Sequence, residues 1–273
     1  PLDENGNKIV RIGHSPDPDD AFMFHAMTTG AFPTPGYNFI HELQDIETLN
    51  HRAMNCELEV SAVSIHAFPE ISNDYALMNC GASMGEGYGP MIVSLPGTST
   101  EELRSSTIAV PGLKTSAYLG LRLAWGDCDI AVVPFDEIIP RVLDGTYQSG
   151  LIIHEGQLTY VDNNLDVHLD LGVWWNERTG GWPMPLGGNV VRRDLGLQVM
   201  EDITKYSENT SAVNPSMIRE INENTSIRKG KFGNYIFYKT HNMSKPKFIK
   251  LNKFKGDYNI CPIKELEDYV SKN

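Results

Sequence analysis

Several features that would place this chain in a specialised class are missing from its 273 residues. Its four cysteines form no Cys-x-x-Cys pair, which argues against a zinc site and against the disulfide framework of a small secreted protein. No apolar run approaches the roughly 20 residues that a membrane helix needs. The polar first residues contain neither an apolar signal segment nor an initiating methionine. We therefore expect a cytoplasmic protein without a membrane partner.

Charge is distributed unevenly along the chain. Residues 206–273 carry 12 Lys and Arg against 7 Asp and Glu, a net charge of +5, whereas the remaining residues carry 11 against 28, a net charge of −17. An acidic body disfavours nonspecific binding to nucleic acid or to anionic membranes. Nucleic acid is therefore expected as a partner only if the basic tail supplies the contacts.

Short apolar segments alternate with helical patterns over most of the chain. Strands are expected at residues 9–14, 58–67, 91–94 and 130–135, helices at 46–54 and 136–145, and a strand, a loop and a helix within 105–118. This alternation predicts an α/β fold with mainly parallel strands. The glycines at 81, 85, 87 and 89 have neither dinucleotide-binding nor Walker-loop spacing, so we expect tight turns there beside a strand.

The most informative segment is residues 150–156, GLIIHEG. An apolar run of this length, closed by glycine, predicts a short buried strand whose end delivers His154. Ligands of open α/β sheets bind beyond the carboxyl ends of the strands, and imidazole has the side-chain pKa nearest neutrality. His154 is therefore a candidate for proton transfer. The structural alternative is a histidine that donates to a backbone carbonyl where the strand ends.

Two predicted helix starts offer hydroxyl groups to a ligand. Ser15 and the PDPDD run after it form a helix-start signal, and the free N–H groups of such a turn can hold a carboxylate or phosphate. The neighbouring acids would resist an anion, so simple capping is the alternative. Thr115 or Ser116 opens another helix, where the hydroxyl either caps the helix or binds a ligand oxygen.

Nine stretches between residues 9 and 205 carry a family resemblance. They are GHSPDPDDAFMFHAMTTG, QDIETLN, EVSAVSIHAF, GASMGEGYGP, AVPGLKTSAYL, PFDEI, GLIIHEGQLTY, DLGVWWNERTG and PLGGNVVRRDLG. In this order they resemble the 1,4-dihydroxy-6-naphthoate synthases of the futalosine route to menaquinone. The resemblance implies a two-lobed fold like that of type 2 periplasmic binding proteins, with a ligand cleft between the lobes. Residues 1–93 and 183–205 would form one lobe and residues 94–182 the other.

The resemblance also implies a carbon–carbon lyase. Its substrate would be cyclic dehypoxanthinylfutalosine, a small-molecule carboxylate that is cleaved to 1,4-dihydroxy-6-naphthoate with release of a three-carbon fragment. His154 corresponds to the family's proposed proton acceptor, and no metal or organic cofactor is expected. Substrate contacts are implied at a turn formed by Ser61, Ala62, Val63 and Ser64, and at Thr115 and Ser116.

Two departures from the family concern charge near the substrate. Some members carry a lysine where this chain has Ala62, which removes a charge contact to the substrate carboxylate. Other members carry SPCPND where this chain has SPDPDD, which leaves the roles of Asp17 and Asp19 open.

Residues 206–273 are a larger departure. In the family the helix that begins near residue 197 would continue into a helical region, whereas here it is expected to stop near Tyr206. The tail resembles a short glycine-and-lysine β-repeat appended to some topoisomerases. Its basic and aromatic residues suit nucleic-acid contacts; they are Lys229, Lys231, Lys245, Lys247, Phe232, Tyr235, Phe237 and Tyr238. The alternatives are a small solvated β-module and a join of unrelated sequence, and we favour the join.

Two other functions compete with the lyase. A non-catalytic solute-binding protein would use the same cleft without needing His154. The chorismate dehydratases of the same pathway resemble this fold, but the GLIIHE motif favours the naphthoate synthase.

Overall fold

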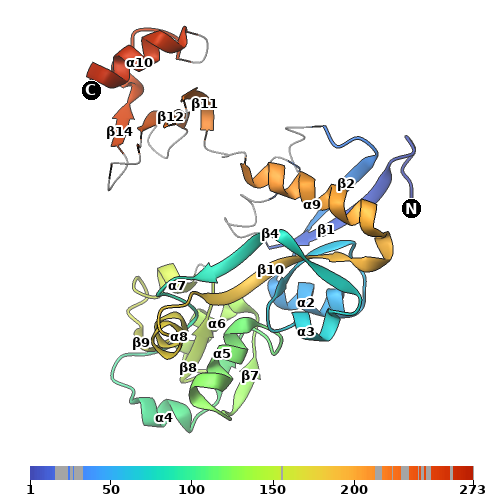
Figure 1. Cartoon of the computed structure of the whole chain (residues 1–273). Coiled ribbons are helices and arrows are strands. Elements are labelled where there is room, and N and C mark those ends of the chain that lie inside the picture. The colour runs from blue at the N-terminus through green and yellow to red at the C-terminus, as the bar shows by residue number, and fades with distance from the viewer. Residues whose placement is uncertain are drawn as a thin grey trace. The chain divides into compact units, whose positions relative to one another are not determined.

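The computed structural model describes residues 1–15, 24, 27, 33–154, 156–212, 217–222, 224–228, 234–238, 240, 243, 247–258 and 261–272. The chain divides into two compact units, Pro1–Thr210 and Ser211–Asn273. The first unit contains two five-stranded sheets, and the second contains one four-stranded sheet. Figure 1 labels the helices and strands of both units.

The first sheet has the order β2-β1-β3-β10-β4. Its strands are β1 (Lys8–His14), β2 (Tyr37–Leu43), β3 (Val60–Ser64), β4 (Tyr75–Gly85) and β10 (Met184–Arg192). Helix α9 (Leu197–Ala212) packs on one face through Val199 and Ile203, against Val10 and Ile12 of β1. Helices α2 (Ile46–Met54) and α3 (Phe68–Ile71) pack against the other face of this sheet through two clusters of buried apolar side chains. This sheet and these three helices form the first lobe.

The second sheet has the order β7-β6-β8-β5-β9. Its strands are β5 (Met91–Ser94), β6 (Ile108–Val110), β7 (Ile130–Val132), β8 (Ser149–Ile152) and β9 (Asp166–Asp170). On one face it packs against α4 (Thr100–Arg104), α5 (Ser116–Trp125) and α8 (Leu171–Thr179), and on the other against α6 (Phe135–Leu143). The short helix α7 (Gly156–Thr159) follows β8. These elements form the second lobe.

The chain passes between the lobes twice, once from β4 to β5 and once from α8 to β10. β4 and β10 pair antiparallel, and Figure 1 shows them running side by side. The crossing segments meet backbone to backbone, because the N–H of Leu171 donates to the carbonyl oxygen of Pro90 at 2.8 Å. A Cβ atom on Gly172 would lie 2.0 Å from the carbonyl oxygen of Tyr88, so this approach requires glycine.

Short polar side chains fix where the helices begin. Asp45, Ser99, Thr115 and Asp170 cap α2, α4, α5 and α8 by accepting hydrogen bonds from backbone N–H groups of the first turn. The Thr115 cap confirms the expected start of that helix, and α2 confirms the expected helix at residues 46–54. No helix in the described parts of the chain is long and apolar enough to cross a membrane.

Other expectations need correction. Both large sheets are mixed rather than mainly parallel: β1 and β6 each pair parallel with two neighbours, whereas β5 and β10 pair antiparallel with theirs. Residues 61–64 lie in strand β3, which agrees with the strand expected at 58–67 and corrects the turn that the resemblance implied. The glycine-rich segment continues β4 as far as Gly85, and the expected turn beside a strand follows at Gly87, whose φ is 73°. Helix α9 continues to Ala212 rather than ending near Tyr206. The expected helix start after Ser15 lies outside the described residues.

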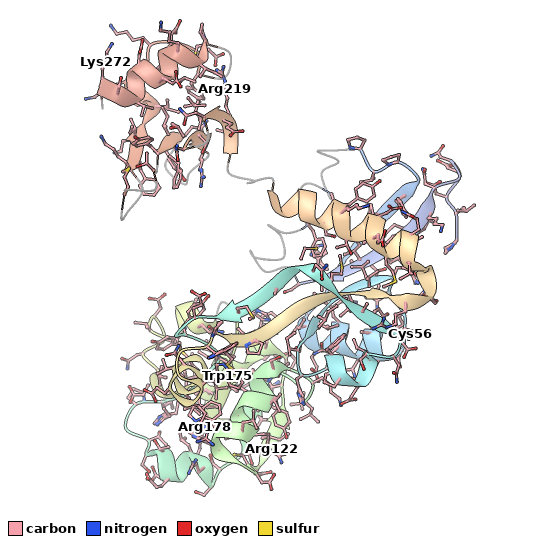
Figure 2. All side chains as sticks on the ribbon, in the orientation of Figure 1. Cys56, Arg122, Trp175, Arg178, Arg219 and Lys272 are labelled. Carbon is pink, nitrogen blue, oxygen red and sulfur yellow. The ribbon has the colours of Figure 1, made fainter. Side chains whose placement is uncertain are left out.

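The second compact unit is a small β-module. Its antiparallel strands are β11 (Met217–Asn222), β12 (Thr225–Arg228), β13 (Tyr235–Tyr238) and β14 (Lys247–Lys250), in that order across the sheet. Isoleucines on one face of the sheet pack with Leu266 of α10 (Ile263–Lys272) into a small core. Arg219 of β11, labelled in Figure 2, donates to the carbonyl oxygen of Tyr258 at 3.0 Å.

Candidate active site

His154 lies two residues beyond the carboxyl end of the fully buried strand β8. β8 pairs parallel with β6, with Ile108 opposite Ser149 and Ala109 opposite Gly150. Parallel neighbours end at the same edge of a sheet, so the segment after β6, which leads into Thr115 and Ser116, emerges at the same edge as His154. The structure therefore brings three of the predicted site residues to one edge of the second sheet.

The backbone of His154 has an unusual conformation. Its φ is 52°, in the left-handed region that residues other than glycine seldom occupy, although asparagine, aspartate and histidine do so more often than most. Its carbonyl oxygen accepts from the N–H of Gln157 at 3.1 Å, which starts the turn into α7. The imidazole is partly buried and lies edge-on to Phe135, the first residue of α6, with ring centroids 5.5 Å apart at 78°. A non-glycine residue held in the left-handed backbone region costs of order 1–3 kcal/mol of folding free energy, and such residues cluster at functional sites.

The candidate residues of β3 are buried, and their hydroxyl groups are engaged within the protein. Ser61 donates from Oγ to the carbonyl oxygen of Ala62 at 2.9 Å. Ser64 accepts at Oγ from Nδ2 of Asn50 at 3.0 Å, and its N–H donates to Oδ1 of the same side chain at 2.8 Å. Ala62 and Val63 contribute only apolar side chains to the core. In this structure these hydrogen bonds fix the carboxyl end of β3, and the serine hydroxyl groups are not left available to a ligand.

Thr115 and Ser116 are buried at the start of α5. Thr115 accepts at Oγ1 from the N–H of Tyr118 at 3.1 Å and donates to the carbonyl oxygen of Gly112 at 2.9 Å, which is the capping role. Ser116 donates from Oγ to the carbonyl oxygen of Leu186 at 2.5 Å and accepts from the N–H of His66 at 3.3 Å. Ser116 therefore joins the second lobe to the first.

Further contacts tie the edges of the two sheets together. Nδ1 of His66, which follows β3, lies 3.1 Å from the carbonyl oxygen of Thr115, so the ring donates there. Glu47 of α2 accepts from the N–H of Lys114, and Nζ of Lys114 lies 2.5 Å from Oε1 of Glu70 on α3. Residues that follow β3 or lie on α2 and α3 of the first lobe thus contact the start of α5 in the second.

Ser15 follows β1 at the same edge of the first sheet as the end of β3, because β1 and β3 are parallel. It is buried, and its carbonyl oxygen lies 3.2 Å from Nδ1 of His14. Nε2 of His14 lies 3.2 Å from Nδ1 of His41 on β2. Burial lowers the pKa of His14, and it lowers the pKa of His41 to about 4 with a smaller contribution from His14. Both imidazoles are therefore neutral near pH 7.

Three residues of this junction were not singled out from the sequence: Glu47, Asn50 and His66. Glu47 and Asn50 lie three residues apart on α2, so they share one helix face. The Asp45 cap two residues before Glu47 marks only where α2 begins, and the partners of these side chains in other segments are not indicated by the local sequence.

A surface pocket of about 610 Å³ lies elsewhere on the second lobe. Its lining includes Ser105 and Ser106, which precede β6, and Tyr147 and Gln148, which precede β8. These residues lie at the amino ends of the two strands, so the pocket is at the opposite edge of the sheet from His154. Within the described residues, no group of three or more His, Cys, Asp or Glu side chains is placed to hold a metal ion.

Comparison with known proteins agrees with this geometry. The family model described as menaquinone biosynthesis matches residues 10–254. A curated 1,4-dihydroxy-6-naphthoate synthase from Thermus thermophilus is 39% identical over 190 residues, covering 69% of this chain and 68% of the relative. A second, from Streptomyces coelicolor, is 38% identical over 194 residues, covering 68% and 67%.

Solved structures show the same architecture. A crystal structure of a protein from Archaeoglobus fulgidus superposes with a TM-score of 0.70 at 45% identity, covering 76% of this chain and 78% of that one. An alkanesulfonate-binding protein from Xanthomonas axonopodis superposes with a TM-score of 0.57 at 10% identity, covering 74% and 72%, which is a likeness of fold alone.

Two mixed sheets, two crossings and facing carboxyl edges define a two-lobed α/β protein of the periplasmic-binding-protein class. Within that class, the matches to the family model and to the two synthases identify the family. The chain belongs to the menaquinone-biosynthesis family.

Proposed function

We propose that this chain is a carbon–carbon lyase that converts cyclic dehypoxanthinylfutalosine to 1,4-dihydroxy-6-naphthoate and a three-carbon fragment. The observation that carries the proposal is the position of His154, at the carboxyl edge of the second sheet beside the start of α5. Membership of the menaquinone-biosynthesis family, with synthases among the relatives, supports the same reaction.

His154 would act as the general base. The imidazole takes the proton of a substrate hydroxyl group, and the oxygen's electron pair forms a new carbonyl as the adjacent carbon–carbon bond breaks. The electron pair of that bond passes to the neighbouring carbonyl as an enolate, which is then protonated, so that His154 can return the proton it took. Ser15, the residues of β3 and the start of α5 would hold the substrate between the lobes. To do so, Ser64, Thr115 and Ser116 would exchange hydrogen bonds within the protein for bonds to the substrate. The left-handed backbone at His154 and the edge-on Phe135 ring support this role, because both restrict the direction of the imidazole.

The test supplies purified protein with the cyclic futalosine intermediate and follows dihydroxynaphthoate. General acid–base groups contribute about 100- to 10,000-fold, so His154→Ala and His154→Gln should lower kcat by that range. The matched control is His168→Gln in the same lobe, whose ring contacts Ser94 Oγ at 2.8 Å and Thr100 Oγ1 at 3.3 Å. The control should retain activity.

Three outcomes would count against parts of this proposal. A folded wild-type protein that forms no product refutes the lyase, and unchanged turnover in His154→Ala refutes the base. Binding of the intermediate without turnover, equally in wild type and in His154→Asn, would identify a solute-binding protein. Dehydration of chorismate in place of futalosine cleavage would identify the sister enzyme.

A second function is proposed for the small β-module: binding of single-stranded nucleic acid. The outer face of its sheet carries Arg228, Tyr235, Phe237, Phe248 and Lys250, which alternate with the buried isoleucines. Phe248 is 61% exposed, and the centre of its ring lies 5.6 Å from that of Tyr235 and 5.9 Å from that of Phe237. The Arg228 guanidinium lies 3.7 Å from the centre of the Phe237 ring. Aromatic rings with adjacent cations suit base stacking and phosphate contact.

This second function is tested with fluorescent oligothymidylate and the full-length chain. Stacking of one base is worth about 1–3 kcal/mol, so Phe248→Ala should weaken binding by about tenfold or more. Lys264→Ala, an exposed lysine of α10, is the matched control and should have little effect. Affinity should fall as salt rises. Affinity that is unchanged in Phe248→Ala, or absent at low salt, would contradict the proposal.

A further inference from the structure

The carboxylate of Glu47 bridges the two lobes. The side chain extends from α2 of the first lobe and is only 14% exposed. Its Oε1 and Oε2 lie 3.1 and 3.2 Å from the N–H of Lys114, which leads into α5 of the second lobe. An anion at this place also meets the positive end of the α5 dipole. The start of α5 is therefore already occupied by a carboxylate that belongs to the chain.

The second lobe is shaped to admit this carboxylate. A Cβ atom on Gly112 would lie 2.2 Å from Cδ and 2.5 Å from Oε2 of Glu47, so a side chain at that position would collide with it. The carboxylate thus lies in a slot with the glycine backbone on one side and the Lys114 N–H at its end. Because the Glu47 carboxylate fits this slot closely, its contact with the second lobe can fix the distance between the two lobes.

The same face of α2 also holds the end of β3. Asn50, one turn after Glu47, binds both the N–H and Oγ of Ser64. Its Nδ2 also lies 3.4 Å from Oε2 of Glu47. One helix face therefore connects Ser64 in the first lobe with the segment of the second lobe that carries Thr115 and Ser116.

We propose that Glu47 is a positioning residue whose carboxylate, docked in the slot at Gly112 and Lys114, sets the closed spacing of the two lobes. Its effect on substrate rests on the proposed lyase function, because that function places the substrate between these edges. When the closed state is only a fraction of the population, the apparent affinity falls by that fraction. Loss of Glu47 therefore raises KM, whereas kcat for bound substrate changes much less.

The first measurement needs no catalysis. Hydrogen exchange of the backbone amides at residues 112–118 should be faster in Glu47→Ala than in wild type, because the Lys114 N–H loses its acceptor. Acetate should slow exchange again by entering the vacated slot, whereas chloride at equal ionic strength should not. Glu137→Ala, an exposed carboxylate of α6 paired with Arg141, is the matched control and should leave this segment unchanged.

The second measurement is the steady-state rate. Glu47→Ala should raise KM about tenfold with kcat within about twofold, and acetate should lower KM again. Glu47→Gln retains one oxygen acceptor of the same length and should lie between wild type and Glu47→Ala. It also carries the test if the alanine variant does not fold.

Each outcome decides the inference. The positioning role would be overturned if Glu47→Ala left amide exchange or KM unchanged. It would also be overturned if exchange became faster and KM rose but acetate reversed neither effect. A wild-type protein without turnover would overturn the lyase function alone, since the exchange experiment still reports on Glu47.

Discussion

The buried carboxylate of Glu59 provides the sharpest stability test in the first lobe. Its side chain is 4% exposed and accepts from Nε and Nη2 of Arg11 at 2.9 and 2.8 Å and from the Arg11 N–H at 2.9 Å. Nη2 of Arg192 on β10 lies 3.3 Å from the same carboxylate. These contacts join β1 and β10 to the residue directly before β3, so the change Glu59→Gln weakens the anchoring of three strands together.

The magnitude follows from burial and charge. Breaking a fully buried ion pair costs about 3–5 kcal/mol, but Arg11 is 39% exposed and can turn to water, so we expect about 2–3 kcal/mol. In a unit of this size each kcal/mol shifts Tm by about 2–4 °C, which gives a loss of about 4–12 °C. Glu137→Gln removes an exposed pair with Arg141 and should cost less than about 0.5 kcal/mol.

The loss should also depend on pH. Burial alone would raise the pKa of Glu59, but the hydrogen bonds and charges of Arg11 and Arg192 outweigh it and hold the pKa below its usual value. The contribution is therefore complete above the unfolded pKa of about 4.3 and is lost as pH falls through the lower folded pKa. Circular-dichroism melts of both variants measure these effects. A Glu59→Gln melt within error of Glu137→Gln at pH 7, or an unchanged gap to wild type in acid, would refute the reasoning.

Three further predictions concern positions that the structure makes sensitive. Burial lowers the pKa of His41 to about 4 in the folded state, so the unfolded chain binds more protons between about pH 6.5 and pH 4, and the free energy of unfolding should decrease across that range. Thermal melts of His41→Gln should show a smaller decrease of stability with pH than wild type does. An equal decrease would contradict the lowered pKa of His41. Gly172→Ala should destabilise by more than about 2 kcal/mol because its Cβ would meet the Tyr88 carbonyl, which urea unfolding would reveal, and a neutral result would mean that the crossing segments can separate. Asp170→Ala removes the cap that accepts from the N–H groups of Gly172 and Val173 at 2.8 and 3.1 Å, so Tm should reflect a loss of about 1 kcal/mol, and an unchanged Tm would show that water replaces the cap.

Local signals predicted much of the fold. Apolar runs located β1, β5, β7 and β8, the helical pattern located α2, and a capping residue located the start of α5, because these signals are contained within a few consecutive residues. The direction of strand pairing was predicted less well. A strand buried on both faces shows the same apolar run whether its neighbours are parallel or antiparallel, and β8 has one of each.

For the candidate site, too, the features held in consecutive residues were predicted and those that depend on distant segments were not. The place of His154 beyond β8 followed from the segment itself, whereas the roles of Glu47 and His66 depend on partners 67 and 49 residues away. Such contacts leave no periodic trace in the sequence. Ser61 was expected in a substrate-contacting turn but lies in buried β3, because the apolar residues around it extend the strand across those positions.

The arrangement of strands separates two kinds of effect on catalysis. His154, Thr115 and Ser116 follow β8 and β6, neighbours in one sheet, so their mutual geometry is fixed within the second lobe. Ser15 and Ser64 follow β1 and β3 of the other sheet, and their distance from His154 depends on how closely the lobes approach. Changes at the interlobe contacts should therefore act mainly on KM, and changes around His154 mainly on kcat, because only the former alter the population of the closed state.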